Sequence, residues 1–130
     1  MDLSNIKPKE LLRFLVGGGS AVLVDYLLYH IFMTGGIFLS GSKALSFFCG
    51  ATVGFVINKF WTFESHSFNK LEIGRYVILY SISACVNAAI NKIVLLVTGI
   101  GILAFLCATA TSTVMNFLGQ KFFVFRRREE

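Results

Sequence analysis

The chain repeats itself at a fixed offset of 62 residues, and the two copies align without a gap. The matched pairs run from one end of each copy to the other: Glu10 and Glu72, Arg13 and Arg75, Val24 and Val86, Asp25 and Asn87, Ile31 and Ile93, Phe55 and Phe117, Lys59 and Lys121, Phe60 and Phe122, and Phe63 and Phe125. A period of this length predicts a duplicated supersecondary unit. In membrane proteins, duplicated halves often enclose a pathway at their junction.

Both copies are apolar enough for a bilayer. Hydrophobic residues make up 55% of the 130 residues and charged residues only 15%, whereas soluble domains carry about 25% charged residues. The mean hydropathy is +0.73. A soluble fold of this size has too little interior to hide so much apolar surface. The net charge of +5 lies at the ends of apolar runs and forms no stripe, which argues against nucleic acid as a partner.

Four stretches are long enough to cross the hydrocarbon layer as helices, at about 20 residues each. They cover residues 11–33, 43–60, 73–97 and 102–123. The first ten residues are polar and have no signal-peptide core, so the first span is expected to remain in the protein. We therefore predict an all-α membrane protein with a single transmembrane domain, 1–130. Its first repeat covers about 10–63, a loop about 64–72, and the second repeat about 73–125.

The cationic residues predict the orientation. Of the 12 lysines and arginines, only Lys43 and Lys92 lie away from the termini and the middle loop. Because lysine and arginine accumulate on the cytoplasmic side, both termini and the loop are expected there. Each repeat is then a hairpin of the same orientation, as in a parallel repeat. We expect a multi-pass membrane protein.

Small residues recur every fourth position on the second and fourth spans. The two stripes are Ser46, Gly50 and Gly54, and Ala108, Ser112 and Asn116. Such spacing lets helix backbones approach closely in lipid. It predicts packing within the bundle or a seam between copies of a homo-oligomer. The three cysteines, Cys49, Cys85 and Cys107, lie in apolar stretches without metal-ligand spacing, and no metal or cofactor is expected.

Polar residues inside the spans are candidates for function. Asp25 follows Arg13 by 12 residues, or about 18 Å of helix, and the repeat places Asn87 at the matching depth. Asn91 follows Asn87 by one helical turn. These groups predict a patch that binds a hydroxyl-rich cargo or carries a proton. Alternatively they are structural, with Asp25 neutral or paired with Lys92 and the asparagines joining helices.

Both even-numbered spans end in a carboxamide, a lysine and an aromatic cluster. Asn58 and Lys59 precede Phe60, and Gln120 and Lys121 precede Phe122. An aromatic belt with an anchoring lysine explains the rings, which also include Trp61, Phe63 and Phe125. A lipid phosphate would also explain the repeated carboxamide, since basic pockets between helices bind anionic headgroups.

These motifs resemble the GtrA family of small four-helix bacterial membrane proteins. The resemblance covers about residues 10 to 126 and rests on four segments, namely 13–18, 55–63, 75–76 and 116–125. It implies a multi-pass protein of the bacterial cytoplasmic (inner) membrane. It also implies translocation across that membrane of a polyprenyl-phosphate-linked monosaccharide, which a separate membrane glycosyltransferase makes. It also implies that the phosphate contacts Arg13, Lys59, Arg75 or Lys121. The second motif departs from the first, with Gln120 in place of Asn58 and Phe123 in place of Trp61.

The first hypothesis is therefore a flippase for a lipid-linked sugar used in cell-surface polysaccharide synthesis or glycosylation. Its polar groove would be lined by Asp25, Asn58, Asn87, Asn91 and Asn116. A second hypothesis is a non-transporting anchor or partner of a polyprenyl-phosphate glycosyltransferase. A third is a small multidrug exporter that uses Asp25. An enzyme is not expected, because no nucleophile and base are paired and no carboxylates cluster.

Overall fold

The structure is a computed structural model that describes residues 3–67 and 69–125. Four long helices dominate it: α1 (Pro8–Thr34), α2 (Leu39–Ile57), α3 (Lys70–Thr98) and α4 (Gly101–Gly119). A short 3-10 helix, η1 (Leu3–Asn5), precedes them. Two π-helices, η2 (Asn58–Thr62) and η3 (Gln120–Val124), directly follow α2 and α4. No β-strand occurs among the described residues, which confirms the all-α prediction.

All four predicted spans are confirmed. The segments that are long and apolar enough to cross a membrane are Pro8–Thr34, Gly41–Thr62, Lys70–Thr98 and Gly101–Val124. Each contains one of the stretches predicted from hydropathy. The chain is thus a multi-pass membrane protein. The cytoplasmic position of its ends stays a prediction, and the basic residues Arg126–Arg128 on which it partly rests lie outside the described residues.

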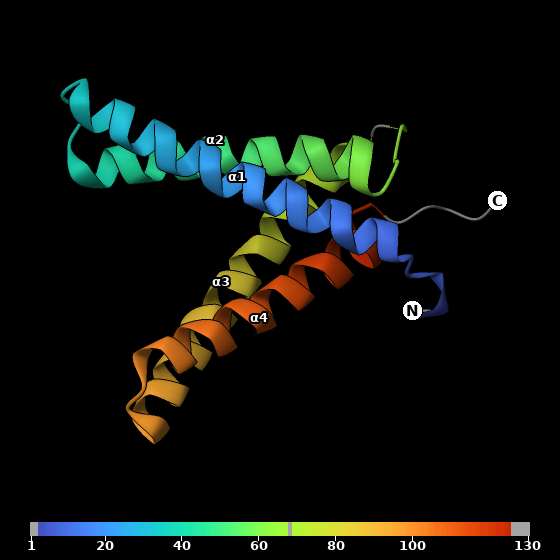
Figure 1. The fold of residues 1–130 in the computed structure, drawn as a ribbon. Helices are drawn as coiled ribbons and strands as arrows, with labels where there is room; N and C mark the ends of the chain where they lie inside the picture. Colours follow the sequence, from blue (N-terminus) through green and yellow to red (C-terminus); the bar gives the residue numbers. More distant parts are fainter. Residues whose placement is uncertain (1–2, 68, 126–130) are drawn as a thin grey trace. The chain divides into compact units, whose positions relative to one another are not determined.

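The chain divides into two compact units, Met1–His66 and Ser67–Glu130. In the first unit α1 packs along α2, and in the second α3 packs along α4 (Figure 1). Each unit is therefore one antiparallel helical hairpin, as the 62-residue repeat predicts. The helix pairs and their π-helical ends have the same order in both units.

Local sequence explains where the helices begin and end. Pro8 lies in the first turn of α1, where a missing N–H costs nothing, and Gly36, with a φ of 94°, follows its end. The Asn69 side chain accepts a hydrogen bond from the N–H of Leu71 and so caps the start of α3. Gly99, with a φ of 69°, ends the same helix in the left-handed conformation that glycine favours.

The hairpins bury small side chains and expose large apolar ones. Ala104 and Ala108 are each only 1% exposed, whereas Leu96 is 75% exposed. Gly50 lies so close to α1 that a Cβ atom there would come within 2.7 Å of the Ala21 carbonyl oxygen. The small-residue stripes therefore serve packing inside each hairpin. The outward apolar faces suit lipid, which also requires the backbone to satisfy its own hydrogen bonds.

Candidate functional site

The two π-helices form the first part of the candidate site. Each has five residues and occupies the same repeat position. The Phe63 N–H bonds to the Asn58 carbonyl at 2.9 Å, and the Phe125 N–H bonds to the Gln120 carbonyl at 2.8 Å. π-helices are rare and frequently mark functional sites. The repeated carboxamide, lysine and aromatic residues thus coincide with a change in backbone geometry that sequence reasoning missed.

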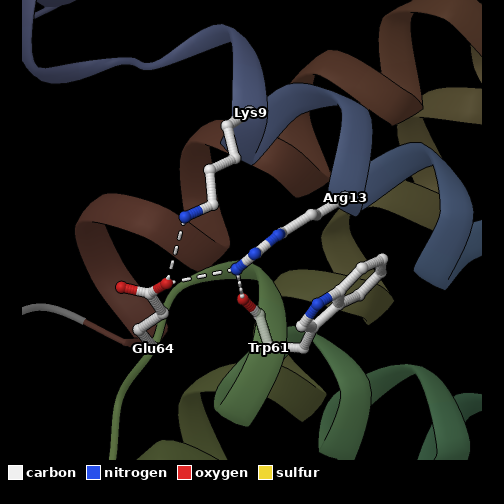
Figure 2. A network of polar contacts seen from close by, with 4 residues as sticks. All are labelled: Lys9, Arg13, Trp61 and Glu64. Atoms are coloured by element: carbon white, nitrogen blue, oxygen red, sulfur yellow. Dashed lines mark hydrogen bonds and ion pairs between the residues drawn. The ribbon is translucent and has the colours of Figure 1, made fainter.

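Arg13 ties the start of α1 to the end of η2. Its Nη1 donates to the Trp61 carbonyl oxygen at 2.9 Å and lies 3.1 Å from Oε1 of Glu64 (Figure 2). The guanidinium also lies over the Trp61 ring, 5.0 Å from its centroid. Lys9 approaches the same Glu64 oxygen at 3.7 Å. We call the set Lys9, Arg13, Trp61 and Glu64 the first arginine cluster.

Arg75 makes the corresponding contacts in the second unit. Its Nη1 donates to the Phe123 carbonyl oxygen at 3.3 Å, and its guanidinium lies 5.5 Å from the centroid of the Phe123 ring. In both units the arginine and its aromatic partner are 48 residues apart. We call Arg75, Lys121 and Phe123 the second arginine cluster. Its geometry shows that phenylalanine replaces tryptophan without loss of the carbonyl contact.

The motif lysines differ between the units. Lys59 is only 1% exposed, and its Nζ donates to the Ser65 hydroxyl at 3.4 Å. Lys121 is only half-buried. Each ammonium lies over the ring of the next residue, Lys59 over Phe60 at 5.5 Å and Lys121 over Phe122 at 5.8 Å. Of the two, Lys121 is the more exposed.

Asn58, which was predicted to line the polar groove, is buried within the π-helical end. Its Oδ1 accepts a hydrogen bond from the Thr62 hydroxyl at 2.9 Å. Gly17 of α1 packs against it, since a Cβ atom there would come within 2.8 Å of the same Oδ1. Two of the aromatic residues that were predicted to lie at the membrane interface, Phe63 and Phe125, are buried as well. The carboxamide therefore supports local packing in this structure.

An ion pair lies inside the first hairpin, well away from η2. Asp25 Oδ2 is 2.7 Å from Lys43 Nζ, and Asp25 Oδ1 accepts a hydrogen bond from the Ser46 hydroxyl at 2.6 Å. Lys43 Nζ also lies over the Tyr29 ring, 5.9 Å from its centroid. The sequence-based alternatives for Asp25 were a neutral group or a pair with Lys92. The structure instead pairs it with Lys43, which the antiparallel turn brings back beside α1.

Two adjoining grooves open beside this ion pair. One, of about 390 Å³, is lined by Val22, Asp25, Tyr26, Tyr29, His30 and Lys43. The other, of about 670 Å³, is lined by Tyr29, Leu39, Lys43, Ala44 and Phe47. Tyr29 and Lys43 belong to both. The pair thus faces a space that combines charged groups, hydroxyls and aromatic rings, the groups that a sugar ring contacts.

The second hairpin has a neutral counterpart to this ion pair. Asn87 Nδ2 donates to the Ser112 hydroxyl at 2.9 Å, and the Ser83 hydroxyl donates to the Ser112 carbonyl at 3.4 Å. Asn91, one turn further along α3, is half-buried. Asn116 Oδ1 is buried and has no hydrogen-bond partner among the residues that the structure describes. The duplicated position 25/87 therefore carries a charge in one unit only.

Sequence reasoning missed the residues that complete these contacts, namely Lys43, Ser46, Glu64 and Ser112. A usable signal existed, because the partners in an antiparallel hairpin lie about equally far from its turn. Asp25 and Ser46 flank the glycine turn at Gly35 in this way, and Asn87 and Ser112 flank Gly99.

Among the described residues, no group of three or more His, Cys, Asp or Glu side chains is placed to hold a metal ion.

Together these features define a small multi-pass membrane protein built from two helical hairpins, each closed by an arginine on a π-helical end. A comparison with protein families identifies it more closely. The family model described as GtrA/DPMS, transmembrane domain, matches residues 13–125. The chain belongs to the GtrA family, which takes part in the handling of lipid-linked sugars and is generally non-catalytic.

Proposed function

We propose that this protein moves a polyprenyl-phosphate-linked monosaccharide across the cytoplasmic membrane, for the synthesis or glycosylation of cell-surface polysaccharide. The observation that carries the proposal is the Asp25–Lys43–Ser46 group beside an open groove in a lipid-exposed hairpin. An ionic group in a span is costly and is a functional candidate by default. Membership of a family that handles lipid-linked sugars supplies the class of cargo.

The groove offers what a sugar loses when it leaves water. Hydrocarbon supplies no hydrogen bonds, so each hydroxyl of the cargo needs a protein partner on its way through. Asp25 accepts hydrogen bonds and Lys43 donates them, while the buried Ser46 hydroxyl holds the Asp25 carboxylate in place. Because the Lys43 side chain is 57% exposed, its ammonium is accessible to a ligand in the groove. Tyr29 supplies a ring face and a hydroxyl beside it.

The phosphate of the cargo would remain near the basic residues at the ends of the hairpins, where Arg13, Lys59, Arg75 and Lys121 lie. The polyprenyl tail stays in lipid throughout. A membrane glycosyltransferase on the cytoplasmic side is the expected source of the lipid-linked sugar. Movement along the concentration gradient or coupled to an ion requires no nucleotide site.

The decisive experiment follows transfer in proteoliposomes. Purified protein is reconstituted with a short-chain prenyl-phosphate hexose, and the fraction of lipid accessible to an impermeant oxidant is measured over time. We expect faster equilibration across the bilayer than in empty vesicles. Equal rates in both preparations would refute translocation and leave the anchoring of a glycosyltransferase as the better hypothesis.

A pair of serine variants tests the groove itself. Ser46→Ala removes the hydroxyl that donates to Asp25, and we expect it to slow transfer. Ser20→Ala is the matched control, since the Ser20 hydroxyl bonds only to the Val16 carbonyl of its own helix. Equal rates for the two variants would show that the Asp25 group does not take part in transfer. Efflux of a lipophilic cation that Asp25→Asn abolishes would instead support the exporter hypothesis.

A further inference from the structure

The two arginine clusters occupy the same repeat positions but differ in charge. Glu64 lies at the end of the first repeat, and the residue at the matching position of the second is Arg126. Lys9 likewise corresponds to Leu71. Glu10 and Glu72 match each other, so neither distinguishes the halves. The position that is acidic in the first repeat is therefore basic in the second.

Glu64 occupies the position that an anionic ligand of Arg13 would need. Its Oε1 lies 3.1 Å from Arg13 Nη1 and 3.7 Å from Lys9 Nζ (Figure 2). A phosphate that approached Arg13 would meet the negative charge of this carboxylate at close range. In the first cluster the Glu64 carboxylate is already paired with Arg13. We call this contact a latch, because it connects α1 to the residue two positions after η2 ends.

The backbone of Glu64 supports this interpretation. Its φ of 49° is the one positive value among the described residues other than glycine. A side chain in the left-handed conformation raises the energy of the backbone, and such conformations persist where surrounding contacts hold them. The Ser65 N–H, next in the chain, bonds to the Lys59 carbonyl at 2.7 Å. The chain thus turns sharply after η2 and directs the carboxylate toward α1.

Arg75 of the second cluster differs from Arg13 in its partners. Within the part of the chain that the structure describes, Arg75 forms no ion pair, and its contacts are the carbonyl and ring of Phe123. A guanidinium has five N–H donors, so one carbonyl leaves most of them for a ligand. Lys121 of the same cluster is half-buried, whereas its counterpart Lys59 is 1% exposed. Lys121 is thus more exposed than Lys59, whereas Arg75 and Arg13 are both half-buried and differ in the carboxylate placed against Arg13.

We propose that the duplicated ends have diverged: Arg75 and Lys121 bind the phosphate of the prenyl lipid, and Arg13 is held by Glu64 in a structural latch. The inference rests on the proposed function for the identity of the ligand. It narrows the four basic residues expected to contact the phosphate to the two in the second half. A paired arginine and lysine suit a phosphate, because the guanidinium binds two oxygens at once and the ammonium adds charge.

The test measures binding of farnesyl phosphate to the full-length protein in detergent by native mass spectrometry. Arg75→Gln and Arg13→Gln form a matched pair, since each removes a guanidinium that donates a hydrogen bond to a backbone carbonyl. We expect Arg75→Gln to weaken binding about tenfold or more, the loss typical of a charge-assisted hydrogen bond. Arg13→Gln should weaken it much less. Equal losses in the two variants would overturn the assignment.

Two further variants keep the test informative if an arginine variant fails to fold. Lys121→Gln leaves the contacts of Arg75 with Phe123 in place and should also weaken binding. Glu64→Gln keeps the shape of the side chain and removes its charge, so binding should be unchanged or tighter because Arg13 becomes available. Weaker binding in Glu64→Gln, or full affinity in Lys121→Gln, would refute the proposal.

Control ligands identify the source of the phosphate and separate this inference from the translocation proposal. Farnesol should not bind at comparable concentration, and inorganic phosphate should not compete with farnesyl phosphate. Competition by inorganic phosphate would show a site for free anions and overturn the lipid assignment. Arg75-dependent binding without transfer in vesicles would refute translocation alone. Normal transfer and binding by Arg75→Gln would refute this inference alone.

Discussion

The ion pair between Asp25 and Lys43 makes a quantitative prediction about stability. Asp25 is 18% exposed and lies deep in α1, whereas Lys43 is 57% exposed and lies near the start of α2. In Lys43→Met the Asp25 carboxylate keeps the hydrogen bond from the Ser46 hydroxyl and loses the ammonium. An unpaired charge near the middle of a span costs about 2.5–3.5 kcal/mol. We expect Lys43→Met to lower the free energy of unfolding by about 2 kcal/mol, since Asp25 keeps its hydrogen bond from Ser46.

Replacing Asp25 should lower the free energy of unfolding by less than replacing Lys43. In Asp25→Asn the exposed Lys43 ammonium can extend to the membrane interface, as long lysine side chains do. The expected loss is about 1 kcal/mol or less, as for a partly exposed ion pair. In the double variant neither charge remains, so it should be more stable than Lys43→Met alone. The resulting coupling energy is about 1–2 kcal/mol, within the range found for residues in contact.

The measurement is a double-mutant cycle on the unfolding free energy in mixed micelles, titrated with a denaturing detergent. Lys92→Met combined with Asp25→Asn is the control cycle, because Lys92 is the partner that the sequence alone suggested. That cycle should be additive to within about 0.5 kcal/mol. Additivity in the Lys43 cycle, or coupling in the Lys92 cycle, would refute the reasoning.

Three further outcomes are expected. Gly50→Ala places a Cβ atom 2.7 Å from the backbone of α1 and should destabilise the protein by about 1–3 kcal/mol. Gly74→Ala is the control, because a Cβ atom there has nothing within 4 Å, and it should not destabilise the protein. Thermal unfolding of both variants checks this. Asn69→Ala removes the cap of α3 and should cost about 1 kcal/mol, and an unchanged melting temperature would contradict it. In a variant without native cysteines, Ser67→Cys should react with an impermeant thiol reagent only from the cytoplasm, and Thr34→Cys only from outside; the reverse pattern would invert the topology.

Several features of this protein follow from the sequence alone, because they depend on local composition. The length of the apolar runs defined the spans, and Gly35 and Gly99 marked their turns. The 62-residue repeat predicted two equivalent hairpins, which the structure contains. Spacing by four residues identified the packing stripe of α2, where Gly50 meets α1. Hydropathy and glycine positions act over one helix or one turn, so no tertiary information was needed.

The partners of the polar residues were decided by the tertiary structure. Asp25 was expected to be neutral or paired with Lys92, and the return of α2 beside α1 instead placed Lys43 against it. Arg13 and Arg75 looked equivalent in the repeat, yet only Arg13 has a carboxylate placed against it among the described residues, through the left-handed backbone at Glu64. Lys59 and Lys121 share a motif, yet one is buried and the other is half-buried. A charge acts on whatever the fold brings within a few ångströms of it, so identical motifs acquire different chemistry when a single neighbour differs.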